Sequence, residues 1–330
     1  NEYGGLLSRR IVNDFKDYCD ICFEKFGDRV RHWTLLNEPG LLAQLGYGTG
    51  IHAPGRGSLL YGKSMGDSAR EPYVVIHNSL LAHAAGSRLY KEKYHATQGG
   101  EVGISLVGIW FLPYSDSNED EEAAERLRDF NLGIYLGPLF NGEYPTSLKY
   151  LVKDRLPTFI DEEKEMIKGS VDFIGLNYYT SNYVRGIPIT SDPPSTYAKD
   201  WFAEIVMFNS AGVSIGPTVD GAVFIRVFPD GLRQVLVYCA KKYNVPKLIV
   251  TENGTTTSVE KTPDYASAFH DRSRVKYMTE HIHAMKQAID EGANVKGYFY
   301  WSLLDSYEFL DGYNLRFGLN FTNFDTLERE

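Results

Sequence analysis

The chain has 330 residues, of which 43% are hydrophobic and 23% are charged, and this composition excludes disorder as its main state. Its 34 Lys and Arg residues against 43 Asp and Glu residues give a formal net charge of -9, which disfavours a nucleic acid or an anionic membrane as a partner. No basic segment followed by an apolar one is visible at the N-terminus, so no targeting signal is identified, and no apolar run approaches the roughly 18 residues of a membrane span.

The first predicted elements are a helix and a short strand. Within residues 11–26 apolar side chains recur at intervals of three and four, which predicts a helix that buries one face: Val12, Phe15, Cys19, Cys22, Phe23 and Phe26. A Gly-Asp pair ends this helix, and residues 30–36 form an apolar run rich in β-forming side chains. We therefore predict a strand that ends at the Asn-Glu-Pro tripeptide of residues 37–39.

The same alternation continues through the middle of the chain. Helices are predicted at residues 71–96, 119–131 and 161–168, and strands at residues 101–107 and 171–177. Residues 181–229 then carry several prolines and little periodicity. An irregular segment of this length in a compact fold usually shapes a binding site, so we expect a lid or a pocket wall there.

Two further pairs of elements complete the pattern. Helices are predicted at residues 231–243 and around 275–289, and strands at residues 247–250 and 298–304. Five strands, each entered from a helix, indicate the α/β class with a parallel sheet, either an open doubly wound sheet or a closed barrel. In both architectures the functional side chains lie at the carboxyl ends of the strands. No stretch has the composition of a linker, so residues 1–330 are interpreted as a single domain.

Three cysteines, Cys19, Cys22 and Cys239, are too few for a disulfide scaffold. The Cys-x-x-Cys pair lies inside a helical pattern, and we interpret it as core packing and not as a redox or metal site. No second Cys or His pair stands at the spacing of zinc ligands, so we expect no metal and no cofactor.

Glutamates stand at two of the predicted strand ends. Glu38 follows the first strand and Glu252 the fourth. An isolated glutamate after a strand is most often a solvated turn residue, but these two would meet at one edge if their strands share a sheet. Two carboxyl groups facing one site suit cleavage of a glycosidic bond, because one protonates the departing oxygen while the other attacks the sugar or activates water.

Four segments at these strand ends carry a resemblance. They are WTLLNEP at residues 33–39, DFIGLNYYT at 172–180, IVTENG at 249–254 and YFYWSLLD at 298–305. In this order they resemble plant β-glucosidases of glycoside hydrolase family 1, and the resemblance covers the whole chain. It implies a (β/α)8 TIM barrel and a retaining hydrolase in which Glu38 is the acid/base and Glu252 is the nucleophile.

The resemblance also implies roles for neighbouring side chains. Asn37 would hold the sugar 2-hydroxyl, Tyr179 would donate a hydrogen bond to the nucleophile, and Trp301 and Glu308 would line the glycone pocket. The further substrate-binding candidates are Asn177, Phe309 and Trp110. Aromatic faces pack against sugar rings and hydrophobic aglycones, although ordinary core packing is the alternative for Trp110.

The proposed chemistry requires opposite environments for two like groups. Glu252 must be ionised and therefore needs hydrogen-bond donors, whereas Glu38 must hold its proton and therefore needs an apolar or anionic neighbourhood that raises its pKa. Once Glu252 carries the sugar, its charge is lost and Glu38 releases its proton more readily. Retention of configuration further requires the carboxyl groups to lie roughly 5 to 5.5 Å apart, against roughly 6.5 to 9.5 Å for inversion.

The resemblance to the family also implies that residue 1 falls just after the third strand of the family's barrel. On this interpretation residues 1–330 are a partial barrel without the first three β/α units and the last helix. We expect such a stretch alone to be unstable or inactive, because open sheet edges remain. The family resemblance suggests the secretory pathway, the vacuole or the endoplasmic reticulum, although the compartment stays unknown.

From these observations we expect an O-glycosyl hydrolase, a retaining β-glucosidase whose partner is a small-molecule β-D-glucoside from a plant. Self-association into a homo-oligomer is left open. Three alternatives stay open as well: a transglucosidase, a thioglucosidase-like relative, and an inactive binding or assembly protein. The run Tyr307-Glu308-Phe309 resembles plant thioglucosidases, but those proteins replace the acid/base with Gln, so Glu38 favours O-glucosides.

Overall fold

The computed structural model describes residues 2–58, 65–192, 194–258, 260–261 and 264–329. Its α-helices are α1 (Ile11–Phe26), α2 (Pro39–Ala43), α3 (Glu71–Leu89), α4 (His95–Gln98), α5 (Asn118–Arg128), α6 (Ile134–Asn141), α7 (Thr146–Val152), α8 (Asp161–Ile167), α9 (Pro229–Tyr243), α10 (Tyr265–Ala268) and α11 (Arg272–Asp290). Its strands are β1 (His32–Asn37), β2 (Glu101–Val107), β3 (Trp110–Pro113), β4 (Phe173–Asn177), β5 (Ser181–Gly186), β6 (Ala203–Val206), β7 (Leu248–Glu252), β8 (Thr257–Ser258), β9 (Val295–Tyr298) and β10 (Leu315–Arg316).

A parallel sheet of five strands forms the centre of the molecule, in the order β1-β2-β4-β7-β9. This is also their order along the chain, and helices separate each strand from the next. In a doubly wound sheet the order reverses at a switch point, whereas in a barrel each new strand is added on the same side. The strand order therefore resolves the two architectures left open by the sequence in favour of the barrel type.

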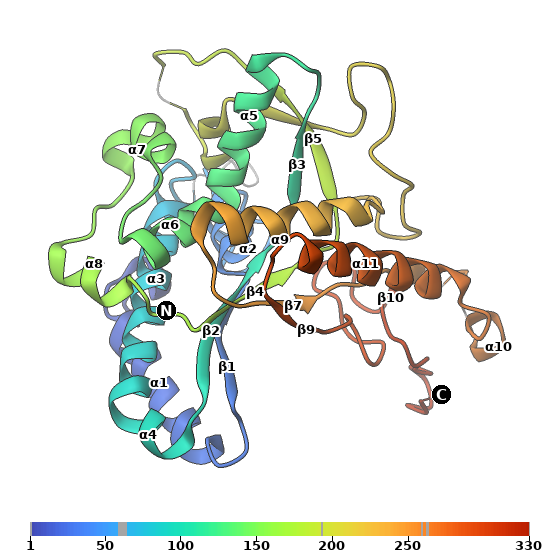
Figure 1. Ribbon diagram of the computed structural model, residues 1–330, viewed down its shortest axis with the longest axis horizontal. Helices are drawn as coiled ribbons and strands as arrows, with labels where there is room; N and C mark the ends of the chain where they lie inside the picture. The colour runs from blue at the N-terminus through green and yellow to red at the C-terminus, as the bar shows by residue number, and fades with distance from the viewer. Residues whose placement is uncertain (1, 59–64, 193, 259, 262–263, 330) are drawn as a thin grey trace.

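The helices bury their apolar faces against this sheet. In α9 the buried residues recur at three and four, as the sequence pattern predicts: Leu232, Val235, Leu236, Cys239 and Tyr243. They belong to one core cluster with Ile174 of β4 and Val250 of β7. Figure 1 shows α9 and α11 side by side, and the two helices pack against each other.

A second, smaller sheet lies beyond the carboxyl ends of β2 and β4. Its strand order is β3-β5-β6. Residues 108–109 separate β3 from β2, and residues 178–180 separate β5 from β4 (Figure 1). This sheet, a 3-10 turn at Tyr197–Trp201 and several bridges occupy much of the segment for which the sequence predicts irregular structure; residue 193 lies outside the described residues. The low periodicity reflects short strands joined by proline-containing loops.

The final strand of the central sheet is the one element whose position was predicted wrongly. It is β9, Val295–Tyr298, and not residues 298–304. Its register is fixed by β7, with Leu248 opposite Val295 and Val250 opposite Tyr298. The aromatic run that follows has high β-propensity but leaves the sheet, whereas Lys and Gly within β9 are poor β-formers that pairing alone holds in the strand.

The structure confirms core packing for Cys19 and Cys239, whereas Cys22 is only partly buried. Cys19 packs in a cluster with Phe23 and Tyr90, and Cys239 lies in the main core. Cys19, Cys22 and Cys239 are all free thiols. Within the described residues there is neither a helix long and apolar enough to cross a membrane nor a group of three His, Cys, Asp or Glu side chains arranged to hold a metal ion.

Candidate active site

Glu38 lies in the turn between β1 and α2. Its backbone is left-handed, with φ 48° and ψ 47°, and its N–H donates to the carbonyl oxygen of Ser105 at the end of β2 over 2.9 Å. Pro39 begins α2 directly afterwards. A left-handed conformation is uncommon for a residue with a side chain and is found at functional sites where the surrounding structure enforces it. The turn holds the Glu38 carboxyl group at the carboxyl edge of the sheet.

Glu252 is the last residue of β7, and its neighbours are donors. The Tyr179 hydroxyl donates to Glu252 Oε2 over 2.8 Å, and the Asn37 side-chain amide donates to Glu252 Oε1 over 3.3 Å. The hydrogen bond between Tyr179 and Glu252 that the sequence predicted is therefore present. The backbone of Glu252 is anchored as well, since its carbonyl oxygen accepts a hydrogen bond from the N–H of Tyr178.

The bond from Asn37 to Glu252 reveals how strongly the sheet curves. Strands β1 and β7 are three positions apart in the sheet, so in a flat sheet they would lie about 14 Å apart. Two short side chains cannot bridge that span and still meet within hydrogen-bond distance. The sheet must therefore bend as the wall of a barrel does, and this bend brings two sequence positions 215 residues apart into contact.

A pair of amides connects the two glutamates. Asn177, at the end of β4, donates from Nδ2 to Glu38 Oε1 and to Asn37 Oδ1, each over 3.0 Å. Asn37 in turn donates to Glu252. Five of the predicted site residues therefore form one hydrogen-bonded group at the carboxyl edge: Asn37, Glu38, Asn177, Tyr179 and Glu252.

The two carboxyl groups differ in their electrostatic surroundings. Burial raises the pKa of Glu38 to about 7, the charge of Glu252 acts in the same direction, and the hydrogen bond from Asn177 opposes the rise. Burial also raises the pKa of Glu252, but hydrogen bonds from Tyr179 and from neighbouring amides oppose this shift. Glu38 is thus placed to hold a proton near neutral pH, while Glu252 is surrounded by groups that stabilise its anion.

Trp301 and Glu308 lie on the same side of the site as Glu252. The Trp301 indole N–H donates to Glu308 Oε1 over 3.2 Å, and the charge of Glu252 contributes to a raised pKa of Glu308, after burial as its main cause. Trp301 is anchored by its backbone N–H, which donates to the Asn253 carbonyl oxygen. Only a glycine fits at position 254, because a Cβ there would lie 2.0 Å from the Trp301 carbonyl oxygen.

Phe309 occupies the open side of this region. It is 76% exposed, and its ring stacks on His52 with centroids 5.6 Å apart and an angle of 22° between the planes. His52 belongs to the loop that follows α2, and Phe309 to the loop that follows β9. Loops from the two ends of the five-strand series therefore meet at this pair.

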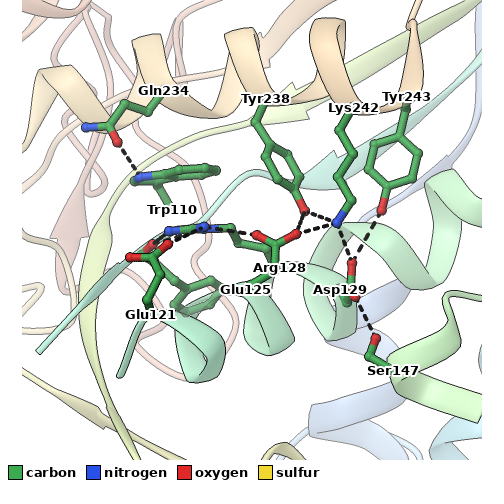
Figure 2. A network of polar contacts seen from close by, with 11 residues as sticks. Trp110, Glu121, Glu125, Arg128, Asp129, Ser147, Gln234, Tyr238, Lys242 and Tyr243 are labelled. Carbon is green, nitrogen blue, oxygen red and sulfur yellow. Dashed lines mark hydrogen bonds and ion pairs between the residues drawn. The ribbon is translucent and has the colours of Figure 1, made fainter. Parts of the chain in front are cut away.

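Trp110 lies in the core between α5 and α9. It is buried, its indole N–H donates to Gln234 over 2.8 Å, and the Arg128 guanidinium lies 4.3 Å from its ring centre. Tyr238 of α9 packs edge-on against the same ring. Figure 2 shows Trp110 in a network of charged and aromatic groups between α5 and α9. Burial and these contacts favour core packing, the alternative given for Trp110, and its substrate-binding role stays a prediction.

Two residues beside Glu252 support the site and were not singled out from the sequence. Asn253 is completely buried: its amide donates to the Tyr178 carbonyl oxygen over 2.6 Å and to the Tyr277 hydroxyl over 3.1 Å, and it accepts from the Tyr298 hydroxyl. Thr251 contacts Asn177 from the other side. Both lie in the IVTENG segment, so their proximity to Glu252 in the sequence was the available signal.

Comparisons with known proteins identify similar sequences over almost the whole chain. A furostanol glycoside 26-O-beta-glucosidase from Hellenia speciosa is 50% identical over 327 residues, which are 98% of this chain and 57% of that protein. Beta-glucosidase 12 from Oryza sativa subsp. japonica is 45% identical over 327 residues, again 98% of this chain and 64% of that protein. The chain thus spans less than two thirds of the length of these relatives.

Solved structures of beta-glucosidases are similar to this chain as well. The crystal structure of the rice Os3BGlu6 beta-glucosidase superimposes with a TM-score of 0.95 at 40% identity, covering 100% of this chain and 70% of that one. A mutant of that rice protein is described in a covalent complex with Glc from GA4GE. The family model described as Glycosyl hydrolase family 1 matches residues 1–330. With a barrel-type sheet and two glutamates at its carboxyl edge, the chain belongs to glycosyl hydrolase family 1.

Proposed function

We propose that the protein is a retaining β-glucosidase that hydrolyses β-D-glucosides of plant small molecules. Glu252 is the nucleophile and Glu38 the acid/base. The observation that carries this proposal is the contrast between the two carboxyl groups, one with a pKa raised to about 7 and the other surrounded by hydrogen-bond donors. Membership of the family and the printed names of the plant relatives support the substrate class.

In the first step Glu252 attacks the anomeric carbon while Glu38 gives its proton to the glycosidic oxygen. The bond to the aglycone breaks, the aglycone leaves as an alcohol, and the sugar remains as an ester on Glu252. The covalent complex described for the rice relative is consistent with such an intermediate. Tyr179 stabilises the attacking carboxylate through its hydrogen bond.

In the second step Glu38 acts as a base. Esterification removes the charge of Glu252, which is one cause of the raised pKa of Glu38, so the proton lost to the aglycone is not readily regained. Glu38 then takes a proton from water, the oxygen of water attacks the anomeric carbon, and the ester bond to Glu252 breaks. Asn37 is proposed to bind the sugar 2-hydroxyl, with Trp301 and Glu308 forming part of the glycone pocket.

The proposal is tested in the whole protein with a 2-deoxy-2-fluoro-glucoside inactivator. We expect one covalent label, found on the peptide that contains Glu252, and a loss of several orders of magnitude in kcat in Glu252→Gln. Glu162→Gln on the exposed surface of α8 is the matched control and should keep normal activity. A protein that neither cleaves an aryl β-glucoside nor accepts the label would instead be a binding or assembly protein.

The same intermediate can be intercepted by an alcohol, which would make the protein a transglucosidase. The two activities are separated by measuring free glucose and transfer product as the acceptor concentration rises. We expect glucose to remain the main product at low acceptor concentration. An aryl thioglucoside tests the thioglucosidase-like alternative. We expect slower turnover than for the O-glucoside, because the proton from Glu38 speeds the departure of an oxygen but gives little help to a thiolate, which leaves without one.

A further inference from the structure

Thr251 precedes Glu252 in β7 and contacts the amide of Asn177. The Thr251 hydroxyl donates to Asn177 Oδ1 over 2.6 Å, a short bond for two neutral groups. Asn177 is 1% exposed, so water has little access to its amide. The hydroxyl therefore provides a protein-based donor for a carbonyl oxygen that is removed from solvent.

The direction of this bond is coupled to the rest of the site. An amide offers an acceptor at one end and donors at the other, so a flip exchanges the two. With Oδ1 facing Thr251, the Nδ2 of Asn177 faces both Glu38 and Asn37. The Oδ1 of Asn37 then accepts, and its own Nδ2 faces Glu252. The hydrogen bonds run in one direction from the Thr251 hydroxyl to the Glu252 carboxylate.

Turning the Asn177 amide would break this order. Its oxygen would then face the Oδ1 of Asn37, where two acceptors would oppose each other, and the same would hold at Glu38 whenever that carboxyl group is ionised. In the turned state the Thr251 hydroxyl would accept from Nδ2, and its own proton would lose the Oδ1 acceptor that it has in the present orientation.

The approach of Thr251 depends on Gly175 in β4. A Cβ at position 175 would lie 2.7 Å from Thr251 Cγ2 and 2.4 Å from Ser105 Oγ, which is closer than side-chain atoms pack. The missing side chain leaves space that Thr251 of β7 and Ser105 of β2 fill from either side.

We propose that Thr251 is a positioning residue of the site, whose hydroxyl fixes the side-chain amide of Asn177 so that both amide N–H groups face Glu38 and Asn37. The proposal deepens the proposed function and rests on it for its catalytic meaning. Thr251 itself touches neither the sugar nor the reacting atoms in this scheme. It acts through the orientation of one amide.

A loss of the hydroxyl has a defined electrostatic consequence. The hydrogen bond from Asn177 lowers the pKa of Glu38, and hydrogen bonds from Asn37 and Asn177 lower that of Glu252. When the amide of Asn177 turns part of the time, these bonds weaken. Both carboxyl groups should then titrate at higher pH, and Glu38 should give up its proton less readily in the first step.

The test compares Thr251→Val, which keeps the shape, and Thr251→Ala, which keeps neither shape nor hydroxyl, with Thr251→Ser, which keeps the hydroxyl. The Glu38 carboxyl is titrated by 13C NMR in the whole protein, with its signal assigned from Glu38→Gln. We expect its pKa to rise by about half a unit to one unit in Val and Ala, since one hydrogen bond to a carboxylate lowers its pKa by roughly one unit. Thr251→Ser should match the parent protein, and the pH profile of kcat/KM should shift in parallel.

The proposal is overturned if a folded Thr251→Val or Thr251→Ala titrates at Glu38 as the parent does, or if Thr251→Ser shifts as far as Thr251→Val. The Ala variant keeps the test decisive if Val does not fold. The NMR titration needs no turnover, so it also separates this proposal from the proposed function: a parent protein that cleaves no glucoside refutes the function, whereas an unchanged Glu38 titration refutes the role of Thr251.

Discussion

Glu38 and Glu252 share a single hydrogen-bonded group but accept different numbers of hydrogen bonds. Glu38 Oε1 accepts from Asn177, whereas Glu252 accepts from Tyr179 at one oxygen and from Asn37 at the other. Burial raises the pKa of Glu38, and the negative charge of Glu252 adds to this shift. The ionisation of one group therefore maintains the protonation of the other, as two-carboxylate glycosidases require.

The first prediction concerns the alkaline limb of the pH profile. Because burial and the charge of Glu252 raise the pKa of Glu38 to about 7, we expect kcat/KM for an aryl β-glucoside to fall above roughly that pH. In the 2-fluoroglucosyl form of the protein, where Glu252 is uncharged, Glu38 should titrate at lower pH. A 13C NMR titration of both forms checks this. Equal pKa values in the two forms would contradict the coupling.

A second prediction concerns the phenol that contacts Glu252, the proposed nucleophile. Tyr179→Phe removes the 2.8 Å hydrogen bond to Glu252, so the pKa of Glu252 should rise and the acidic limb of kcat/KM should move to higher pH. A hydrogen bond to a charged group contributes about 1.5 to 3 kcal/mol, so kcat should fall roughly 10- to 100-fold.

Tyr178→Phe is the matched control for that variant. The Tyr178 hydroxyl donates to the Phe228 carbonyl oxygen over 2.5 Å and pairs with Ser181, and it makes its contacts within the core. Its loss should lower the melting temperature and leave the acidic limb in place. If both variants moved the limb equally, the effect would come from local packing and not from the bond to Glu252.

The third prediction links Glu38 to stability. Its pKa is about 7 in the folded chain against 4.5 for an ordinary glutamate, so the folded state binds the extra proton between these values and stability falls as pH rises from about 4.5 to about 7. Glu38→Gln lacks this loss. The free energy of unfolding of Glu38→Gln, relative to that of the parent protein, should rise across this pH window by about 1 to 3 kcal/mol and then stay constant. Thermal unfolding at several pH values measures it, and a difference independent of pH would refute it.

The fold was predictable wherever the apolar side chains of an element recur at a regular interval. The helix at Ile11–Phe26 and the strand at Glu101–Val107 have the predicted bounds, because their apolar periodicity is uninterrupted. The strand at Val295–Tyr298 was misplaced, since its pairing with β7 overrides local propensity. The small sheet of β3, β5 and β6 was missed because its strand sequences, WFLP, SNYVRG and AEIV, have no sustained alternation of apolar and polar residues.

The site was predictable to the extent that it lies at strand ends. Strand-end position and family resemblance together identified Glu38, Glu252 and Asn177. Neither could predict the surroundings of Trp110, because its indole N–H donates to Gln234, which lies on a helix more than a hundred residues later in the chain. Sequence also carried no sign of the direction in which the Asn177 amide points, because that depends on a hydroxyl from another strand.

A fourth prediction concerns the buried ion pair beneath the loop that carries Glu308. Asp305 and Arg316 have side chains only 2% and 5% exposed and lie 2.6 Å apart, and Asp305 also accepts from the backbone N–H groups of Gly318 and Thr322. Asp305→Ala leaves the guanidinium unpaired in the interior, which typically costs about 3 to 5 kcal/mol. Urea unfolding should show this loss.

The control for that variant is an exposed pair. The Glu204 and Arg185 side chains are 48% and 49% exposed, so Glu204→Ala should change the free energy of unfolding by less than about 1 kcal/mol. Because the loop between Asp305 and Arg316 contains Glu308, we also expect Asp305→Ala to raise KM for a glucoside. A loss of stability no larger than that of Glu204→Ala would show that the buried pair is not required.

The last prediction separates core packing from substrate binding at Trp110. Trp110→Phe removes the N–H bond to Gln234 and reduces the aromatic face over which Arg128 lies. Unpairing the Gln234 oxygen and weakening a cation–π contact should lower the free energy of unfolding by about 1 to 3 kcal/mol. Because the ring is enclosed by Arg128 and Tyr238, the ratio of kcat/KM values for glucosides with small and large aglycones should not change (Figure 2). Trp301→Phe is the comparison: it removes the bond to Glu308 at the proposed glycone pocket, so it should raise KM for every glucoside. A selective loss of the large-aglycone substrate in Trp110→Phe would restore the binding role that burial of this ring argues against.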